Sequence, residues 1–138
     1  MRFMLIRKAD GATEAGVLPS PELIAAMGRY NEEMVRAGVL VSGEGLQPTS
    51  KGARVRFSGG KPAVTDGPFT ETKELVAGVA LIEVASMDEA IEWVRRWPTL
   101  DGGGNAEIEI RPVWQITDLG SGPEIEHHVR LREQMAAR

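Results

Sequence analysis

The 138-residue sequence predicts an α+β fold of the ferredoxin-like (split β-α-β) type, with a β-hairpin inserted between its two halves. Two segments repeat apolar residues at helical spacing and begin with residues that cap helices. Short apolar segments flank each of them, as strands would. A Gly-Gly turn joins two alternating segments in the middle of the chain. This length suits one domain with a single core.

The first β-α-β unit begins with the short apolar run of residues 2–8, which predicts a central strand. Ser20 and Pro21 are residue types preferred at the cap and the first position of a helix. Apolar residues then recur at spacings of three and four as far as Gly38, a plausible left-handed end of the helix. Residues 39–46 predict the second strand, with apolar side chains on both faces.

The inserted hairpin is predicted from strict alternation in residues 53–57, a turn at residues 59–60 and a returning strand over residues 61–65. Residues 75–84 are almost wholly apolar and predict a buried central strand.

The second helix follows a predicted capping box, in which Ser86 is the cap and Glu89 lies three residues later. It runs to about Trp97, before a proline that stops it. A flexible glycine-rich loop is expected next, and residues 106–116 alternate as the last core strand. Pro112 places that strand at an edge or a bulge.

A Gly-Ser-Gly-Pro segment separates the tail from the rest of the chain. We therefore expect a ferredoxin-like domain over residues 1–119 and a helical extension over residues 120–138. The apolar stripe of the tail helix is thin, so the helix is expected to dock on this subunit or on a partner.

Composition excludes several classes of function. With no cysteine in the chain, thiol nucleophiles, disulfides and cysteine-based metal sites are absent. A formal net charge of −4 disfavours nucleic acid as a partner. No apolar run approaches the roughly 18 residues of a membrane span or the core of a signal peptide, so we expect no membrane and a cytoplasmic location.

We also expect no cofactor and no metal. The Gly102-Gly103-Gly104 run follows a helix and lacks the Gly-Lys-Ser/Thr ending of a phosphate loop. His127 and His128 point in different directions on a helix, and no Cys, and no third ligand at helical spacing except Glu124, completes a ligand shell.

Two helices can cover one face of the predicted sheet, whereas the other face stays apolar. Such a surface has to be covered by a second copy of the chain or by a ligand. A homodimer is therefore expected.

The segment Thr65 to Glu74 combines a turn with a cluster of ionisable side chains at the start of an apolar strand. Asp66 is a candidate general base or ligand-binding group at the mouth of a pocket, or it forms an Asx turn. Glu71, Lys73 and Glu74 are candidate ligand-binding residues, or they form a surface ion-pair cluster.

Four further residues are candidates for a ligand site. Tyr30, Ser42 and Glu44 meet at a cavity if the first helix lies over the second strand. Arg111 holds an anion, or it pairs with Glu109 or Glu107 across the sheet.

Several separated blocks resemble the YCII-related proteins, and within them the branch named for its Asp-Gly-Pro-Phe tetrapeptide. The match spans most of residues 1–113. The blocks are Ser20-Pro21-Glu22, Ala37 to Leu40, Gly43 to Pro48, Thr65 to Glu74, Asp88-Glu89-Ala90 with Trp93, and Glu109 to Pro112. The resemblance implies a domain of the dimeric α+β barrel type.

In the wider group a His and an Asp are proposed to act together as an acid–base pair, and one relative is a lyase that removes halide from an aromatic intermediate. This chain departs from that pattern, because its first helix offers Met27, Arg29 and Tyr30 where that His is expected. The resemblance also implies an association with extracytoplasmic-function sigma factors.

Three hypotheses follow from the sequence, of which the third is a structural dimer with vestigial catalysis. In the first, a homodimer binds a small, potentially aromatic molecule and transfers protons without a cofactor, with Asp66 as the base. In the second, the protein is a non-enzymatic accessory of a sigma-factor signalling unit and acts through the tail helix or the Asp66 loop.

Overall fold

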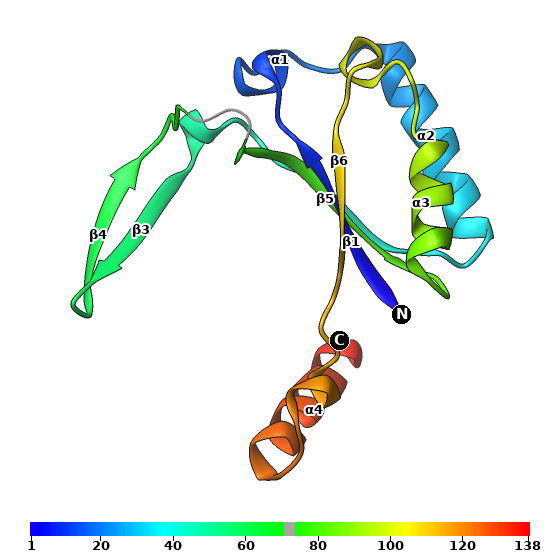
Figure 1. Ribbon diagram of the computed structural model, residues 1–138. Helices are drawn as coiled ribbons and strands as arrows, with labels where there is room; N and C mark the ends of the chain where they lie inside the picture. The colour runs from blue at the N-terminus through cyan, green and yellow to red at the C-terminus, as the bar shows by residue number, and fades with distance from the viewer. Residues whose placement is uncertain (71–73) are drawn as a thin grey trace.

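The computed structural model describes residues 1–70 and 74–138. A four-stranded antiparallel sheet forms its centre (Figure 1). The strands are β1 (Arg2–Lys8), β2 (Leu40–Gly45), β5 (Val76–Glu83) and β6 (Ile108–Pro112), in the order β2-β5-β1-β6. This is the strand order of the split β-α-β plan, so the predicted ferredoxin-like α+β fold is confirmed. As predicted, β1 is central and the proline-containing β6 lies at an edge.

Helices α2 (Pro21–Arg36) and α3 (Met87–Arg95) lie side by side on one face of the sheet (Figure 1). The Ser20 hydroxyl accepts a hydrogen bond from the Leu23 N–H at 3.1 Å and so caps α2 as predicted. At its end Gly38 has φ +71° and donates to the Val35 carbonyl, while the next N–H bonds to Met34, which completes a Schellman motif.

The predicted capping box of α3 forms only in part. The Ser86 hydroxyl accepts from the Glu89 N–H at 3.2 Å, but the Glu89 carboxylate accepts from the N–H of Ala85 and not from that of Ser86. The helix ends at Arg95, two residues before the predicted end.

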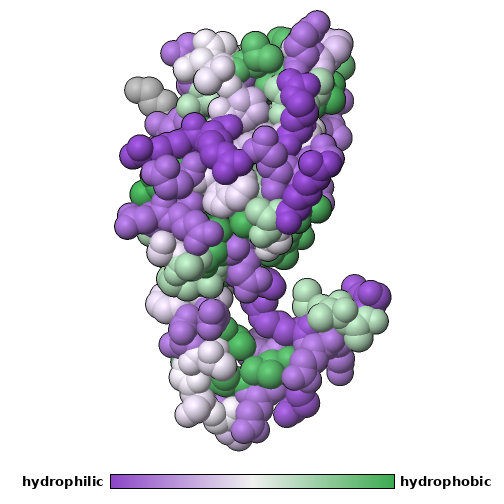
Figure 2. All heavy atoms as spheres, turned by 90° about the vertical axis from the view of Figure 1, so that its right-hand side faces the viewer, coloured by the Kyte–Doolittle hydropathy of each residue, from purple (hydrophilic) through white to green (hydrophobic). Residues whose placement is uncertain are grey.

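The core lies between this helical layer and the sheet. Strand β1 contributes Phe3 and Leu5 to it, and β5 contributes Ile82, all three at most 1% exposed. The helices contribute Tyr30, Met34 and Ala90. Figure 2 looks at the helical side, whose outer surface is mostly hydrophilic. This amphipathic arrangement is the one predicted from the helical spacing of apolar residues.

Within residues 1–70 and 74–138, no helical layer covers the other face of the sheet (Figure 1). Residues 39–46 were expected to be buried on both faces, and within a single chain this expectation is wrong. Strand β2 is an edge strand, and Val41 to Gly45 are exposed.

Strands β3 (Ala53–Ser58) and β4 (Lys61–Asp66) form the predicted hairpin as a separate two-stranded sheet. The hairpin extends away from the end of the main sheet (Figure 1). The described residues also form short elements that the sequence did not reveal: helix α1 (Gly11–Glu14) and the 3₁₀ helices η1 (Thr49–Lys51), η3 (Asp101–Gly104) and η4 (Ile116–Leu119).

The tail contains the expected helix, α4 (Pro123–Ala136), which packs against η4 and lies beyond the end of the sheet opposite η3 (Figure 1). Among the described residues, no helix is both long enough and apolar enough to cross a lipid bilayer.

Candidate functional site

The Asp-Gly-Pro-Phe segment fixes the root of the hairpin. Gly67 lies so close to η1 that a Cβ there would overlap the carbonyl oxygen of Thr49. The Gly67 N–H donates to the Gly52 carbonyl at 3.0 Å. Glycine is therefore required at this position by close backbone approach, which is a structural reason for the motif.

Phe69 extends this attachment to helix α1. Its N–H donates to Thr49 Oγ1 at 3.0 Å, and that hydroxyl donates to Glu14 Oε2 at 2.7 Å. The Thr49 N–H also donates to Glu14 Oε1 at 2.8 Å, and these two bonds lower the pKa of Glu14. The Arg54 guanidinium lies 3.9 Å from the centre of the Phe69 ring, a cation–π contact.

Asp66 is the last residue of β4, opposite Ala53, and is exposed. A hollow of about 490 Å³ lies next to this root, between the end of β2 and η1. Its walls include Leu46, Pro48, Phe69 and Val76. Asp66 is not among the described residues that line it, so its role as a general base stays a prediction.

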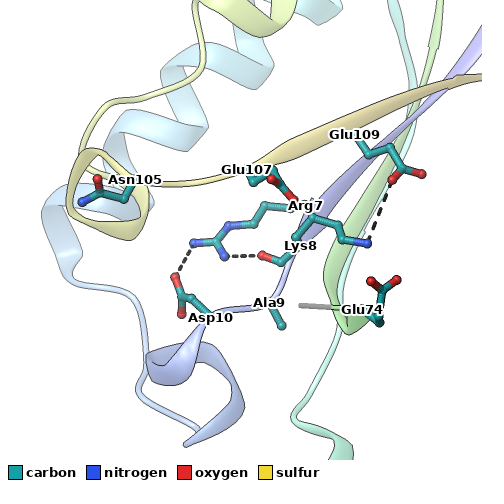
Figure 3. Close-up of a pocket in the computed structure, with 8 residues that line it drawn as sticks. All are labelled: Arg7, Lys8, Ala9, Asp10, Glu74, Asn105, Glu107 and Glu109. Atoms are coloured by element: carbon teal, nitrogen blue, oxygen red, sulfur yellow. Dashed lines mark hydrogen bonds and ion pairs between the residues drawn. The ribbon is translucent and has the colours of Figure 1, made fainter. Parts of the chain in front are cut away.

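A second, more polar hollow of about 530 Å³ lies where β1 ends and β5 and β6 begin (Figure 3). It is lined by Arg7, Lys8, Ala9, Asp10, Glu74, Asn105, Glu107 and Glu109. The Lys8 side chain runs toward Glu109, with Nζ 4.0 Å from Oε1, and Glu74 lies below it in the view. The Lys8 side chain is only 15% exposed.

Arg7 forms the inner wall and is held in place by several partners. Its Nε and Nη2 atoms donate to the two oxygens of Asp101 at 3.1 and 2.8 Å, and Nη2 also donates to Asp10 at 3.1 Å. Nη1 donates to the Lys8 carbonyl at 2.5 Å. The Arg7 side chain is 8% exposed, and its charge is balanced by these carboxylates.

The same contacts shift the titration of the three groups. The hydrogen bond to Asp101 raises the pKa of Arg7 despite its burial. Burial alone would raise the pKa of Asp101, but hydrogen bonds from Arg7 and Trp97 outweigh it, so the pKa is lowered. The backbone N–H of Thr13 contributes most to the lowered pKa of Asp10. Both carboxylates are thus held in their charged forms.

Tyr30 lies on the helical side of the sheet, apart from the hollow. Its hydroxyl donates to the Trp93 carbonyl at 2.6 Å, and burial raises its pKa to about 12. It therefore does not meet Ser42 and Glu44, and the predicted cavity between them does not form. The reason is that residues 42 and 44 point to the opposite face of β2.

The strand register places Ser42 opposite Leu81 and Glu44 opposite Val79. Leu81 is also opposite Met4, which in turn lies opposite Arg111. Directly opposed residues of antiparallel strands share a face. Ser42, Glu44 and Arg111 therefore lie on the open face of the sheet, where Arg111 Nε approaches Glu109 Oε2 at 4.0 Å. Glu109 is one of the partners predicted for Arg111, but the contact lies along β6 and not across the sheet.

Of the three charged residues predicted around the strand entry, Glu74 lines the polar hollow. Glu71 and Lys73 lie outside the described residues. Within residues 1–70 and 74–138, no three His, Asp or Glu side chains are grouped as metal ligands.

Residues 1–116 match the YCII-related domain. The chain belongs to the YCII-related family. This YCII-related protein is 40% identical over 79 residues to an uncharacterised protein of Rhizobium meliloti (strain 1021), an alignment that covers 57% of this chain and 63% of the relative. The chain thus spans less than two thirds of that relative's length. Membership in the Asp-Gly-Pro-Phe branch stays a prediction, with which the sequence at residues 66–69 is compatible.

A solved structure similar to this YCII-related protein is 5-chloro-2-hydroxyhydroquinone dehydrochlorinase from Burkholderia phenoliruptrix AC1100, in complex with 2,5-dihydroxybenzoquinone. It is 19% identical, the match covers 83% of this chain and 94% of that chain, and the TM-score is 0.42.

Sequence reasoning did not identify Arg7 and Lys8 of this YCII-related protein as site residues, and it considered Glu107 only as a partner of Arg111. Both cations stand at the end of an apolar run, where they served only to end the predicted first strand. The available signal was the alternation of β1, which puts Lys8 on the same face as Met4 and Ile6, and Arg7 on the face of Leu5.

Proposed function

We propose that this YCII-related protein is a homodimer that binds a small polar molecule in the hollow around Lys8 and transfers protons there without a cofactor. The observation that carries the proposal is the grouping of a shielded ammonium with the carboxylates of Glu74, Glu107 and Glu109 in one hollow. Pockets with a few convergent charged groups are the usual sites of binding and catalysis.

The charges define the class of ligand. The charge of Arg7 is already balanced by Asp101 and Asp10, so Lys8 is the cation that faces the three glutamates. Carboxylates accept hydrogen bonds and the ammonium donates them. A molecule with several hydroxyl groups, such as a hydroxylated aromatic ring, satisfies both.

The same groups support one chemical step. A glutamate carboxylate within hydrogen-bond reach accepts the proton of a ligand hydroxyl, so the ligand O–H bond breaks and a carboxyl O–H bond forms. The Lys8 ammonium then stabilises the resulting oxyanion. Asp66 remains a second candidate base, and its contribution requires that the hairpin of one chain reach a ligand.

The open sheet face supports the homodimer. Its centre carries Met4, Ile6, Val79 and Leu81, whose side chains are apolar and only half-buried within one chain. A second copy that covers them removes apolar surface from water. Ser42, Glu44 and Arg111 flank this apolar centre, and Lys8 and Glu109 lie at its end. A ligand in the hollow would therefore border the interface.

Ligand binding is tested by native mass spectrometry of the purified protein, followed by calorimetric titration with catechol and with cis-1,2-cyclohexanediol. Glu109→Gln removes one carboxylate of the hollow without changing its shape, and Glu92→Gln on the outer side of α3 is the matched control. We expect catechol affinity to fall at least tenfold in Glu109→Gln and to stay unchanged in Glu92→Gln. Equal affinities in all three proteins, or no binding of either diol, would refute the proposal.

The link to sigma factors and the cytoplasmic location stay predictions.

A further inference from the structure

We infer that the β3–β4 hairpin is a docking arm whose apolar face packs on a second copy of this chain. The inference rests on the homodimer proposed above and adds an interface to it. Strands β3 and β4 pair only with each other among the described residues, and every residue of both strands is exposed. An isolated two-stranded hairpin has marginal stability in water, so a covering surface is needed.

The hairpin has one basic face and one mainly apolar face, which ends at Asp66 opposite Ala53. Val55 is opposite Val64 and Phe57 is opposite Pro62, so these four side chains share a face. Val55, Phe57 and Val64 are 55%, 68% and 69% exposed. Three large apolar side chains exposed together on so small an element are typical of an interaction surface.

The opposite face carries Arg54 and Arg56, and Lys61 lies at the tip. Residues 51–66 contain four basic side chains and one acidic side chain, whereas the whole chain has a formal net charge of −4. The rest of the molecule is therefore acidic. This net negative charge attracts the basic arm of a second copy, which favours a second copy as the partner, while the face that packs is the opposite one, with Val55, Phe57 and Val64.

The arm is fixed where it leaves the body. Gly67 packs against the Thr49 backbone, and Phe69 is tied through the Thr49 hydroxyl to Glu14. These contacts anchor the hairpin at its root, and its two strands pair with no other described strand, so the hairpin projects away from the core of its own chain. This is the arrangement expected of an arm that reaches another molecule.

The arm is also continuous with the open face of the sheet. The arm follows β2 and precedes β5 in the chain, and in Figure 1 it lies on the side of the sheet away from α2 and α3. A second copy on the open face therefore lies next to the place where the arm begins. Burial of the arm would enlarge the same interface.

The absence of cysteine from the sequence makes a direct test possible. The variant Phe57→Cys is labelled with benzophenone maleimide in an equal mixture of ¹⁴N- and ¹⁵N-protein, and Thr65→Cys on the basic face is the matched control. We expect cross-linked peptide pairs of mixed isotope from position 57, several-fold more abundant than from position 65. Pairs of a single isotope only would overturn the inference.

Val64→Lys and Thr65→Lys then introduce the same charge on the two faces of the arm. Sedimentation equilibrium should give a dimer dissociation constant at least tenfold weaker for Val64→Lys, with Thr65→Lys close to the unmodified protein. A dimer equally tight in both variants would overturn the docking arm and leave the sheet homodimer intact. A protein that is monomeric before any substitution would overturn both, whereas ligand binding in the hollow is read separately by calorimetry.

Discussion

Loss of the ion pair between Arg7 and Asp101 should destabilise the folded protein strongly, because both side chains are largely buried. Asp101 accepts two hydrogen bonds from Arg7 and one from Trp97 Nε1 at 2.9 Å, and the Asp101 side chain is 14% exposed. Removal of one partner of a buried pair costs about 3 to 5 kcal/mol. Asp101→Asn keeps one acceptor oxygen, and Asp10 still faces Arg7, so we expect a loss near the lower end, about 3 kcal/mol.

Urea unfolding measures this loss of stability. The control is Asp88→Asn, in the exposed first turn of α3, for which we expect a loss of about 1 kcal/mol or less.

The pKa of Asp101 is lowered in the folded state. Its contribution is therefore complete above the unfolded pKa of about 4 and is lost as the pH falls through the folded value. The difference between the unmodified protein and Asp101→Asn should be constant near pH 7 and should shrink below about pH 4. A difference under about 1 kcal/mol at pH 7, or one that is unchanged down to pH 3, would refute this reasoning.

Two further predictions concern the hairpin root and the core. Gly67→Ala places a Cβ onto the Thr49 carbonyl and should lower the melting temperature of the protein. The control Gly28→Ala lies in a helix with open space around it and should leave the melting temperature unchanged or raise it. Equal melting temperatures of the two variants would contradict the close approach of Gly67 to Thr49. Tyr30 is the chain's single tyrosine, so its phenol can be titrated by absorbance near 295 nm and should ionise at about pH 12 in the folded protein. Because this pKa is raised by burial, the associated stability is complete below the ordinary value of about 10 and is lost as the pH rises through about 12. Ionisation near pH 10 without unfolding would show that the phenol is not buried.

Local sequence signals were sufficient for the order of the elements. Ser20 and Pro21 marked the start of α2, and Gly38 its end, because capping depends on residues within a few positions of each other. The strand order then followed from the known arrangement of two β-α-β units. Helix α1 and the 3₁₀ helices were not predicted because each has only three or four residues and so shows no periodicity.

Long-range pairing could not be read in the same way. Arg7 and Asp101 are 94 positions apart. The first sits in an apolar run and the second in a glycine-rich segment that was predicted to be a flexible loop. No local pattern connects them, so the sequence could not predict the hydrogen bonds between Arg7 and Asp101 beside the polar hollow.

The faces of β2 were misjudged for a related reason. Gly43 and Gly45 interrupt its alternation, so the sequence does not show that Ser42 and Glu44 lie away from α2. The prediction that they meet Tyr30 failed on that point. Asp66 was predicted as a general base because of its carboxylate. In the structure, the close contacts of its motif are made by Gly67 and Phe69, at the root of the hairpin.

The central claim is that a second copy of the chain covers the open face of the sheet. Sedimentation equilibrium tests this claim most directly. Leu81→Arg places a charge in the middle of the open face, and Ile24→Arg makes a similar change at a side chain on α2 that is 59% exposed. The unmodified protein and Ile24→Arg should sediment as dimers, and Leu81→Arg should be a folded monomer at the same concentration. A folded monomer in the unmodified protein, or a Leu81→Arg dimer as tight as the unmodified one, would contradict the account.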